Sequence, residues 1–196
     1  IQGLDYYSTL QGWIKGVNMP GDVAGQYDLG HDGNHNLSGN NNKYFARDEY
    51  AYALGYHEKD YTPIGAGYTT NPLQLAPTIE NGRAWTDMDA NIRDRNYGSS
   101  GSVTGLFNGN IAYMLTDLPK LGQQGISDRL NGMTYQYDAL HRIRYADSHK
   151  WTGSSWGGDN GYNTKYTYDA NGNIKSLVRS TPNFVGGPMD ELSYIY

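Results

Sequence analysis

The sequence predicts an all-β fold built from antiparallel hairpins, with at most one short helix. Among 196 residues, 19 tyrosines stand against only 3 phenylalanines, and 26 glycines are spread along the chain. Aromatic residues favour the pleated surface of a strand, and glycine supplies the positive φ that many turns require. The third observation is internal repetition, because one segment recurs with its tyrosines, aspartate and isoleucine in the same places.

Two full copies of this repeat lie in the C-terminal half. One runs Tyr135-Gln136-Tyr137-Asp138-Ala139-Leu140-His141-Arg142-Ile143, and the other runs Tyr166-Thr167-Tyr168-Asp169-Ala170-Asn171-Gly172-Asn173-Ile174. A third copy starts at Tyr194-Ile195-Tyr196, where the sequence stops. The chain is therefore expected to be a piece of a larger protein.

Each copy of the repeat predicts a β-hairpin. Tyr166 and Tyr168 are two residues apart, so they share one face of a strand. Asp169 suits the first position of a type I turn, where its carboxylate accepts a backbone N–H two residues on, and Gly172 suits the last position. His141 replaces this glycine in the earlier copy, and it is interpreted as a turn residue because histidine enters left-handed conformations more readily than most residues. Stacked repeats are expected to place their tyrosine pairs side by side.

Weaker copies lie upstream. Asn108-Gly109-Asn110-Ile111 repeats the end of the second full copy, without its tyrosines. At the N-terminus, placing Ile14 on Ile174 aligns Gly12 with Gly172 and Lys15 with Lys175. The spacing of the hairpin is thus retained where the motif itself is not.

The chain is treated as one domain, residues 1–196, in three parts. Residues 1–68 are expected to hold N-terminal hairpins and a loop rich in glycine and asparagine at 18–43. Residues 69–105 are an irregular insertion, in which residues 85–92 could form the one short helix. Residues 106–196 return to regular hairpins, with a loop expected at 152–161.

Composition excludes several classes of function. A net charge of -5 gives no general attraction to phosphate backbones, so nucleic acid is not an expected partner. The chain has no cysteine, which rules out disulfides and thiolate metal sites. No stretch approaches the roughly 18 apolar residues of a membrane span.

The sequence offers no convincing catalytic, cofactor or metal site. The run Asp28-Leu29-Gly30-His31-Asp32-Gly33-Asn34 resembles a calcium loop, but Gly39 stands where an EF-hand needs a bidentate glutamate. His31 and His35 are four apart outside any expected helix, so they are not interpreted as a metal pair. The acidic residues that could form a pair are explained by charged strand edges: Asp48, Glu49, Glu58 and Asp60. The chain is therefore predicted not to be an enzyme.

The repeat Tyr-x-Tyr-Asp with its following isoleucine resembles the tyrosine-aspartate (YD) repeat of RHS proteins, wall-associated proteins and teneurins. Four further segments resemble the longer arrays of Bacteroidetes RHS proteins: residues 7–16, residues 46–48 with 54–56, residues 60–64 and residues 108–114. The resemblance implies a long antiparallel sheet that spirals into a hollow shell. In RHS proteins of the polymorphic toxin class, such a shell encloses a C-terminal toxic domain.

The resemblance implies a secreted or cell-surface scaffold without catalysis of its own. Its partners would be the remaining repeats and the C-terminal cargo domain of the parent protein, with surface glycans or a secretion apparatus as further candidates. The self-cleaving core of such proteins carries an Asp-Pro-x-Gly type motif, and this sequence contains no Asp-Pro. The alternative is a carbohydrate-binding or adhesion module, in which Trp151 and Trp156 would stack on sugar rings. Unpaired edge strands are expected to associate with other chains.

Overall fold

The computed structural model describes residues 3–18, 20, 30–47, 49–57, 108–118, 130–151, 156–158, 161–181 and 188–196. Within these ranges the chain forms strands and turns and no helix. The predicted all-β hairpin fold is therefore confirmed. The insertion at 69–105, with the helix expected at 85–92, lies outside the described residues.

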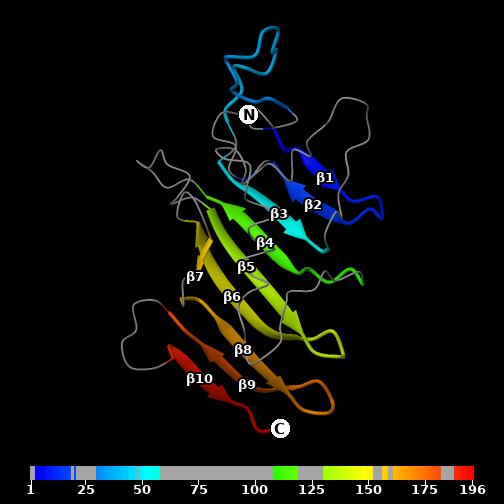
Figure 1. The fold of residues 1–196 in the computed structure, drawn as a ribbon, viewed down its shortest axis with the longest axis vertical. Helices are drawn as coiled ribbons and strands as arrows, with labels where there is room; N and C mark the ends of the chain where they lie inside the picture. The colour runs from blue at the N-terminus through cyan, green and yellow to red at the C-terminus, as the bar shows by residue number, and fades with distance from the viewer. Residues whose placement is uncertain are drawn as a thin grey trace.

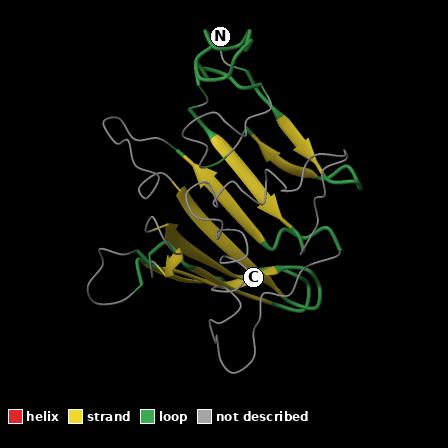
Figure 2. Ribbon diagram, turned by 45° about the horizontal axis from the view of Figure 1, so that its top comes forward, coloured by secondary structure: helices red, strands yellow, loops and turns green. Residues whose placement is uncertain are grey.

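Ten strands form one open sheet, with neighbours running antiparallel. The strands are β1 (Tyr6–Ser8), β2 (Ile14–Val17), β3 (Ala51–Gly55), β4 (Tyr113–Asp117), β5 (Leu130–Tyr137), β6 (Ile143–Trp151), β7 (Trp156–Gly158), β8 (Thr164–Tyr168), β9 (Ile174–Arg179) and β10 (Asp190–Ser193). Nine of them follow one another across the sheet in chain order, from β1 to β6 and then from β8 to β10 (Figure 1). Figure 2 shows that the sheet twists, because β8 to β10 are seen at a different angle from β1 to β4.

The one departure from this order is β7, which pairs with the C-terminal half of β6. The loop expected at 152–161 is therefore wrong in part, because Trp156–Gly158 forms a short strand there. Lys150 pairs with Gly157 and Trp151 with Trp156. The N-terminal half of β6 pairs with β8 instead, through Tyr145 and Ala146. A strand of nine residues is long enough to hold both partners on the same edge.

One face of the sheet is buried, and the register across β3 to β6 defines it. Ala53 pairs with Leu115, which pairs with Gly132, which pairs with His149. Ala53 and Leu115 are fully buried. Because paired residues in antiparallel strands share a face, these rows form a continuous buried layer, which also holds the polar side chains of Asp117, Thr134 and His149.

Gly55 at the end of β3 has no room for a side chain. A methyl group there would overlap the ring of its register partner, Tyr113. The Nζ atom of the buried Lys15 lies 5.9 Å from the centre of the same ring. The Tyr113 ring therefore fills the space above the glycine and lies within cation–π distance of the Lys15 ammonium group.

The opposite face is lined by half-buried apolar and aromatic side chains. Its members are Tyr52, Leu54, Met114, Met133, Tyr135, Tyr166 and Leu177. In β3, β4 and β5 they alternate with the buried positions, and the register of β6, β8 and β9 continues the same face to Tyr166 and Leu177. This face, called the aromatic face below, carries the tyrosine pairs of the repeat.

At the end of the sheet away from the hairpin turns, asparagine side chains hold the backbone. Asn18 has a φ of 55°, is buried, and accepts a hydrogen bond from the N–H of Asp5 at 2.9 Å. Its side-chain amide donates to the carbonyl of Tyr50 at 2.8 Å. The loop at 30–47 is attached through Gly30, whose N–H donates to the Asp5 carboxylate at 2.7 Å. The described part of the loop expected at 18–43 is thus ordered by amide and carboxylate contacts.

Among the described residues, no helix is long and apolar enough to cross a membrane.

Candidate functional site

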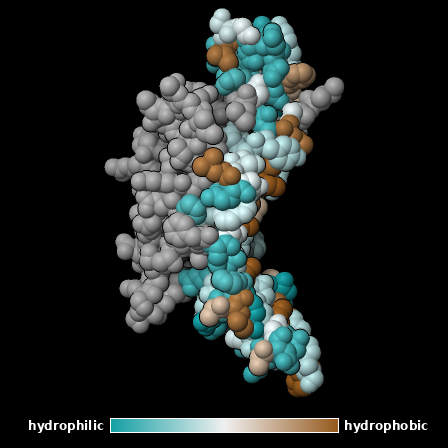
Figure 3. Space-filling view, turned by 90° about the vertical axis from the view of Figure 1, so that its right-hand side faces the viewer, coloured by the Kyte–Doolittle hydropathy of each residue, from teal (hydrophilic) through white to brown (hydrophobic). Residues whose placement is uncertain are grey.

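The residues of the repeat motif gather at one end of the sheet, where the hairpins turn. The turn end is defined here by residues 9–13, 108–110, 138–142 and 169–173. In Figure 1 the complete turns lie on the right-hand side, at the N-terminal, middle and C-terminal parts of the sheet. Viewed from that side, the surface of the described residues is mostly hydrophilic with scattered hydrophobic residues (Figure 3).

Asp169 organises the turn between β8 and β9. The N–H of Gly172 donates to the Asp169 carbonyl at 3.2 Å, and Gly172 has a φ of 93°. This is a type I turn followed by a residue in the left-handed region, a common three-residue hairpin connection. One carboxylate oxygen of Asp169 accepts the N–H groups of Asn171 at 2.9 Å and Asn173 at 2.8 Å. The other accepts the Asn173 side-chain amide at 2.9 Å.

Asp138 repeats this geometry between β5 and β6. Its carbonyl accepts the N–H of His141 at 3.0 Å, and its carboxylate accepts those of Leu140 at 2.8 Å and Arg142 at 3.0 Å. His141 has a φ of 61°, so it occupies the position of Gly172, as its alignment suggested. Arg142 adds an ion pair with the Asp138 carboxylate, with 2.7 Å between Nε and Oδ2.

The turn between β1 and β2 has the same geometry without an aspartate. The N–H of Gly12 donates to the Thr9 carbonyl at 2.9 Å, and Gly12 has a φ of 83°. The Thr9 hydroxyl accepts the N–H of Trp13 at 3.1 Å, as the carboxylate does elsewhere. The sequence alignment found this hairpin by spacing, and the short hydroxyl side chain explains how the turn survives the loss of aspartate.

The three hairpins of the turn end, β1–β2, β5–β6 and β8–β9, each contain a β-bulge at a basic residue. The second strand of each hairpin is called the return strand below. In each return strand, the residue directly after the isoleucine has no register partner on the first strand. The bulged residues are Lys15, Arg144 and Lys175. A bulge strengthens the local twist and bends the strand. Its repetition in β2, β6 and β9 gives these three strands the same local distortion.

A tyrosine hydroxyl bonds each hairpin to the next strand of the sheet. In four places a tyrosine O–H donates to the carbonyl of an isoleucine that lies at or just before the start of the preceding return strand. The pairs are Tyr56 with Ile14 at 2.7 Å, Tyr137 with Ile111 at 2.8 Å, Tyr168 with Ile143 at 2.7 Å and Tyr196 with Ile174 at 3.2 Å. These four contacts are called the tyrosine–isoleucine bonds. They join strands that no tight turn connects.

Two of the bonding tyrosines are also covered by the residue that precedes the isoleucine. The Arg142 guanidinium carbon lies 4.5 Å from the centre of the Tyr168 ring. Trp13 occupies the equivalent place over Tyr56, with 5.1 Å between ring centres. Each tyrosine ring is thus contacted by a guanidinium or an indole group, and its hydroxyl donates a hydrogen bond to the isoleucine carbonyl.

The turns also contact one another along the turn end. Arg142 donates from a guanidinium nitrogen to the Asp169 carbonyl at 3.2 Å. The Nδ1 atom of His141 lies 2.8 Å from the side-chain nitrogen of Asn108 and 3.2 Å from that of Asn110. Successive turns are thus linked by polar side chains, which sequence spacing did not predict.

Burial raises the pKa of the tyrosines on the aromatic face. Burial is the main cause of the raised pKa of Tyr135, Tyr137 and Tyr168. A charge on Tyr135 raises the pKa of Tyr137 further, and a charge on Tyr166 does the same for Tyr168. The hydrogen bond to Ile111 acts in the opposite direction on Tyr137, as the Arg142 charge does on Tyr168. The hydroxyls therefore remain protonated donors at neutral pH.

The turn aspartates have pKa values below their ordinary value of 3.8. For Asp169 the main cause is the hydrogen bond from the Asn173 side chain, and for Asp138 it is the N–H of Arg142. Because the folded pKa is lowered, the ionised turns stabilise the fold above the ordinary pKa, and this contribution is lost as pH falls through the folded value.

An Asp169→Asn variant tests this dependence, because asparagine keeps an oxygen that accepts the two backbone N–H groups but does not titrate. We expect the advantage of the wild-type chain over the variant to shrink as pH falls below about 4. Urea unfolding measured at steps from neutral to acidic pH gives the comparison. A difference in unfolding free energy that is constant over this range would contradict it.

One expectation about the tyrosine pairs is wrong. They do not stand side by side, because a return strand lies between each pair and the next. The register partners of Tyr166 and Tyr168 are Leu177 and Ile174. The close aromatic contact is within the pair, whose rings stack with 6.4 Å between centres. This contact does place the two rings on one face, as predicted.

The other sequence candidates do not come together as a site in the described residues. Asp32 accepts the N–H of Gly3, and Asn34 accepts that of Asn36, so both oxygens hold backbone. His35 packs edge-on against Tyr44. Asp28, Asp48, Glu58 and Asp60 lie outside the described residues. In the described part of the chain, no group of three or more acidic, histidine or cysteine side chains is placed to hold a metal ion.

Of the two tryptophans proposed for sugar binding, the one whose side chain is described has little free surface. Trp151 is 6% exposed. The Trp13 ring is covered by Tyr56 on one side and approached by Gly109, where an added Cβ would lie 3.1 Å from it. The side chain of Trp156 is not among those described. The described indoles therefore act as packing residues.

Comparison with known proteins gave no relative: no family model, curated protein or solved structure matched the chain.

Proposed function

We propose that the chain is a wall segment of an RHS/YD-repeat protein, a non-catalytic scaffold of a secreted or surface protein. The observation that carries the proposal is the series of tyrosine–isoleucine bonds, which recur at every second strand junction of the sheet, four times in the described residues. A sheet assembled from equivalent hairpins through equivalent bonds can be extended by repetition. This is the property required of a wall.

Every residue type that defines the repeat has a structural role in this arrangement. The second tyrosine donates its hydroxyl, the aspartate holds the turn, the glycine or histidine adopts positive φ, and the isoleucine offers its carbonyl. The motif is therefore explained by folding chemistry. The proposed activity of the parent protein resides in a C-terminal toxin or effector domain that the wall encloses, carries or displays.

Enclosure predicts protection of that domain from proteases. In the parent protein we expect the domain that follows the repeats to resist trypsin, while the same domain expressed alone is cleaved rapidly. Mass spectrometry of timed digests compares the two. Equal rates of cleavage would contradict enclosure.

The alternative function, carbohydrate binding, predicts a different result for the isolated chain. Saturable binding to a specific polysaccharide on a glycan array, lost when Trp156 is replaced by alanine, would favour the alternative over the scaffold. The packing of Trp13 and Trp151 favours the scaffold.

A further inference from the structure

An asparagine followed by glycine can react with its own backbone. The glycine nitrogen attacks the side-chain carbonyl carbon (Cγ) of the asparagine, which closes a succinimide ring and expels ammonia. Glycine has no side chain to obstruct this approach. The described part of the chain holds three such pairs, which are Asn108-Gly109, Asn131-Gly132 and Asn171-Gly172.

The side-chain carbonyl of the exposed Asn108 is held by a backbone donor. Its Oδ1 atom accepts the N–H of Asn110 at 3.0 Å. This hydrogen bond closes a ring of atoms that contains Cγ of Asn108 and the nitrogen of Gly109, so the two reacting atoms lie on the same side of the chain. Negative charge builds on Oδ1 when the nitrogen attacks, and an N–H already aimed at that oxygen stabilises the charge.

His141 contacts the nitrogen that has to leave. Its Nδ1 atom lies 2.8 Å from Nδ2 of Asn108. The orientation of this amide is fixed, because its oxygen accepts the N–H of Asn110. The nitrogen of a planar amide offers no lone pair to a proton, but attack at Cγ turns it into an amine that accepts one. An imidazole nitrogen at this distance is placed to supply that proton as a general acid.

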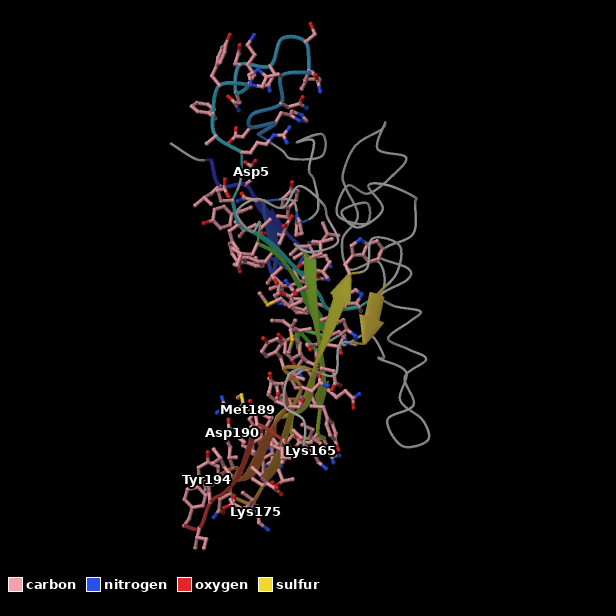
Figure 4. The ribbon with its side chains drawn as sticks, turned by 90° about the vertical axis from the view of Figure 1, so that its left-hand side faces the viewer. Asp5, Lys165, Lys175, Met189, Asp190 and Tyr194 are labelled. Carbon is pink, nitrogen blue, oxygen red and sulfur yellow. The ribbon has the colours of Figure 1, made fainter. Side chains whose placement is uncertain are left out.

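The other two pairs are held against this reaction. Gly132 lies inside β5, where the register fixes an extended backbone between β4 and β6. The nitrogen of Gly172 is engaged, because its N–H donates to the Asp169 carbonyl at 3.2 Å. Lys175, which follows this last turn, lies near the C-terminal end of the sheet in Figure 4, with Asp5 toward the other end. The turn at 169–173 is therefore a control that shares the sequence Asn-Gly and the exposure of Asn108.

We propose that Asn108 is a site of self-catalysed deamidation, with His141 as its general acid. The nitrogen of Gly109 forms a bond to Cγ and gives its proton to water. The bond from Cγ to Nδ2 then breaks, and ammonia leaves with a proton from His141, which takes another from water. Water opens the succinimide at either of its two carbonyls and gives aspartate or isoaspartate in place of Asn108.

The products would alter a place where neighbouring hairpins meet. The turn at 108–110 precedes Ile111, whose carbonyl accepts the Tyr137 hydroxyl. On its other side the turn approaches Trp13, to which a Cβ added at Gly109 would lie 3.1 Å away. Isoaspartate adds a methylene to the backbone just before these contacts, and both products replace the amide beside His141 with a carboxylate. The reaction does not depend on the scaffold function.

Peptide mapping by mass spectrometry, after timed incubation of the folded chain at neutral pH, measures deamidation at each asparagine. We expect Asn108 to react at least about tenfold faster than Asn171, which is below the ~10²–10⁴-fold that positioned acids and bases supply in enzymes. In urea, where the turns are lost, the two sites should react at similar rates. Equal rates in the folded chain would overturn the proposal.

His141→Asn tests the role of the imidazole. Asparagine also adopts positive φ, so the turn is kept while the acid is removed. We expect deamidation of Asn108 to slow by about tenfold and that of Asn171 to stay the same. A turn that was merely loosened would react faster, because a mobile asparagine reaches the attack geometry more often. An unchanged or faster rate at Asn108, in a variant that circular dichroism shows to be folded, would therefore rule out His141 as the acid.

Discussion

Replacement of Leu115 by alanine is expected to lower the free energy of unfolding by about 2–5 kcal/mol. Leu115 is fully buried at the centre of β4. Its register partners on the two sides are Ala53 and Gly132, which have little side chain with which to fill a vacated space. A cavity is therefore retained, and its cost adds to the lost transfer free energy of the leucine side chain.

Leu118→Ala is the matched control, because it removes the same atoms one residue beyond β4, where the leucine is 56% exposed. We expect an effect within about 0.5 kcal/mol. Urea denaturation followed by tryptophan fluorescence measures both variants. Similar losses in the two variants would contradict the assignment of the buried face.

Removal of two tyrosine–isoleucine bonds together is expected to cost about 1–3 kcal/mol, at about 0.5–1.5 kcal/mol for each hydroxyl. The variant is Tyr56→Phe with Tyr168→Phe, which keeps both rings and their contacts with Trp13 and Arg142. β4, β5 and β6 separate the two sites, so their effects should add.

The control pair is Tyr52→Phe with Tyr166→Phe. These tyrosines lie on β3 and β8, close to the tested residues, and among the described residues neither hydroxyl makes a tyrosine–isoleucine bond. We expect little change in the midpoint of urea unfolding for this pair. If the two double variants lose equal stability, the hydroxyl bonds do not hold the hairpins together.

The local chemistry of the hairpins could be predicted from the sequence. The turn at Asp169, the left-handed His141 and the shared face of Tyr166 and Tyr168 depend on residues within a few positions of each other. Such features follow from side-chain reach and from the alternation of a strand. The all-β class followed from the same reasoning over the whole chain.

The strand at Trp156–Gly158 and the arrangement of the tyrosine pairs could not be predicted in this way. Glycine and serine around residues 152–161 indicate a loop, and only the exposed edge of a long β6 recruits part of that segment as a strand. The tyrosine pairs were expected to be neighbours, but the second strand of each hairpin lies between one pair and the next, and this order is a property of the whole sheet.

The sequence by itself determined which residues turn the chain and which face the tyrosines share, because those choices are local. The tertiary structure decided what the tyrosine hydroxyls bond. Tyr56 and Ile14 are separated by 42 positions, and Tyr56 stands in none of the Tyr-x-Tyr-Asp copies. Its partner is fixed by the order and register of the strands, which are set by packing across the sheet and cannot be read from neighbours in the chain.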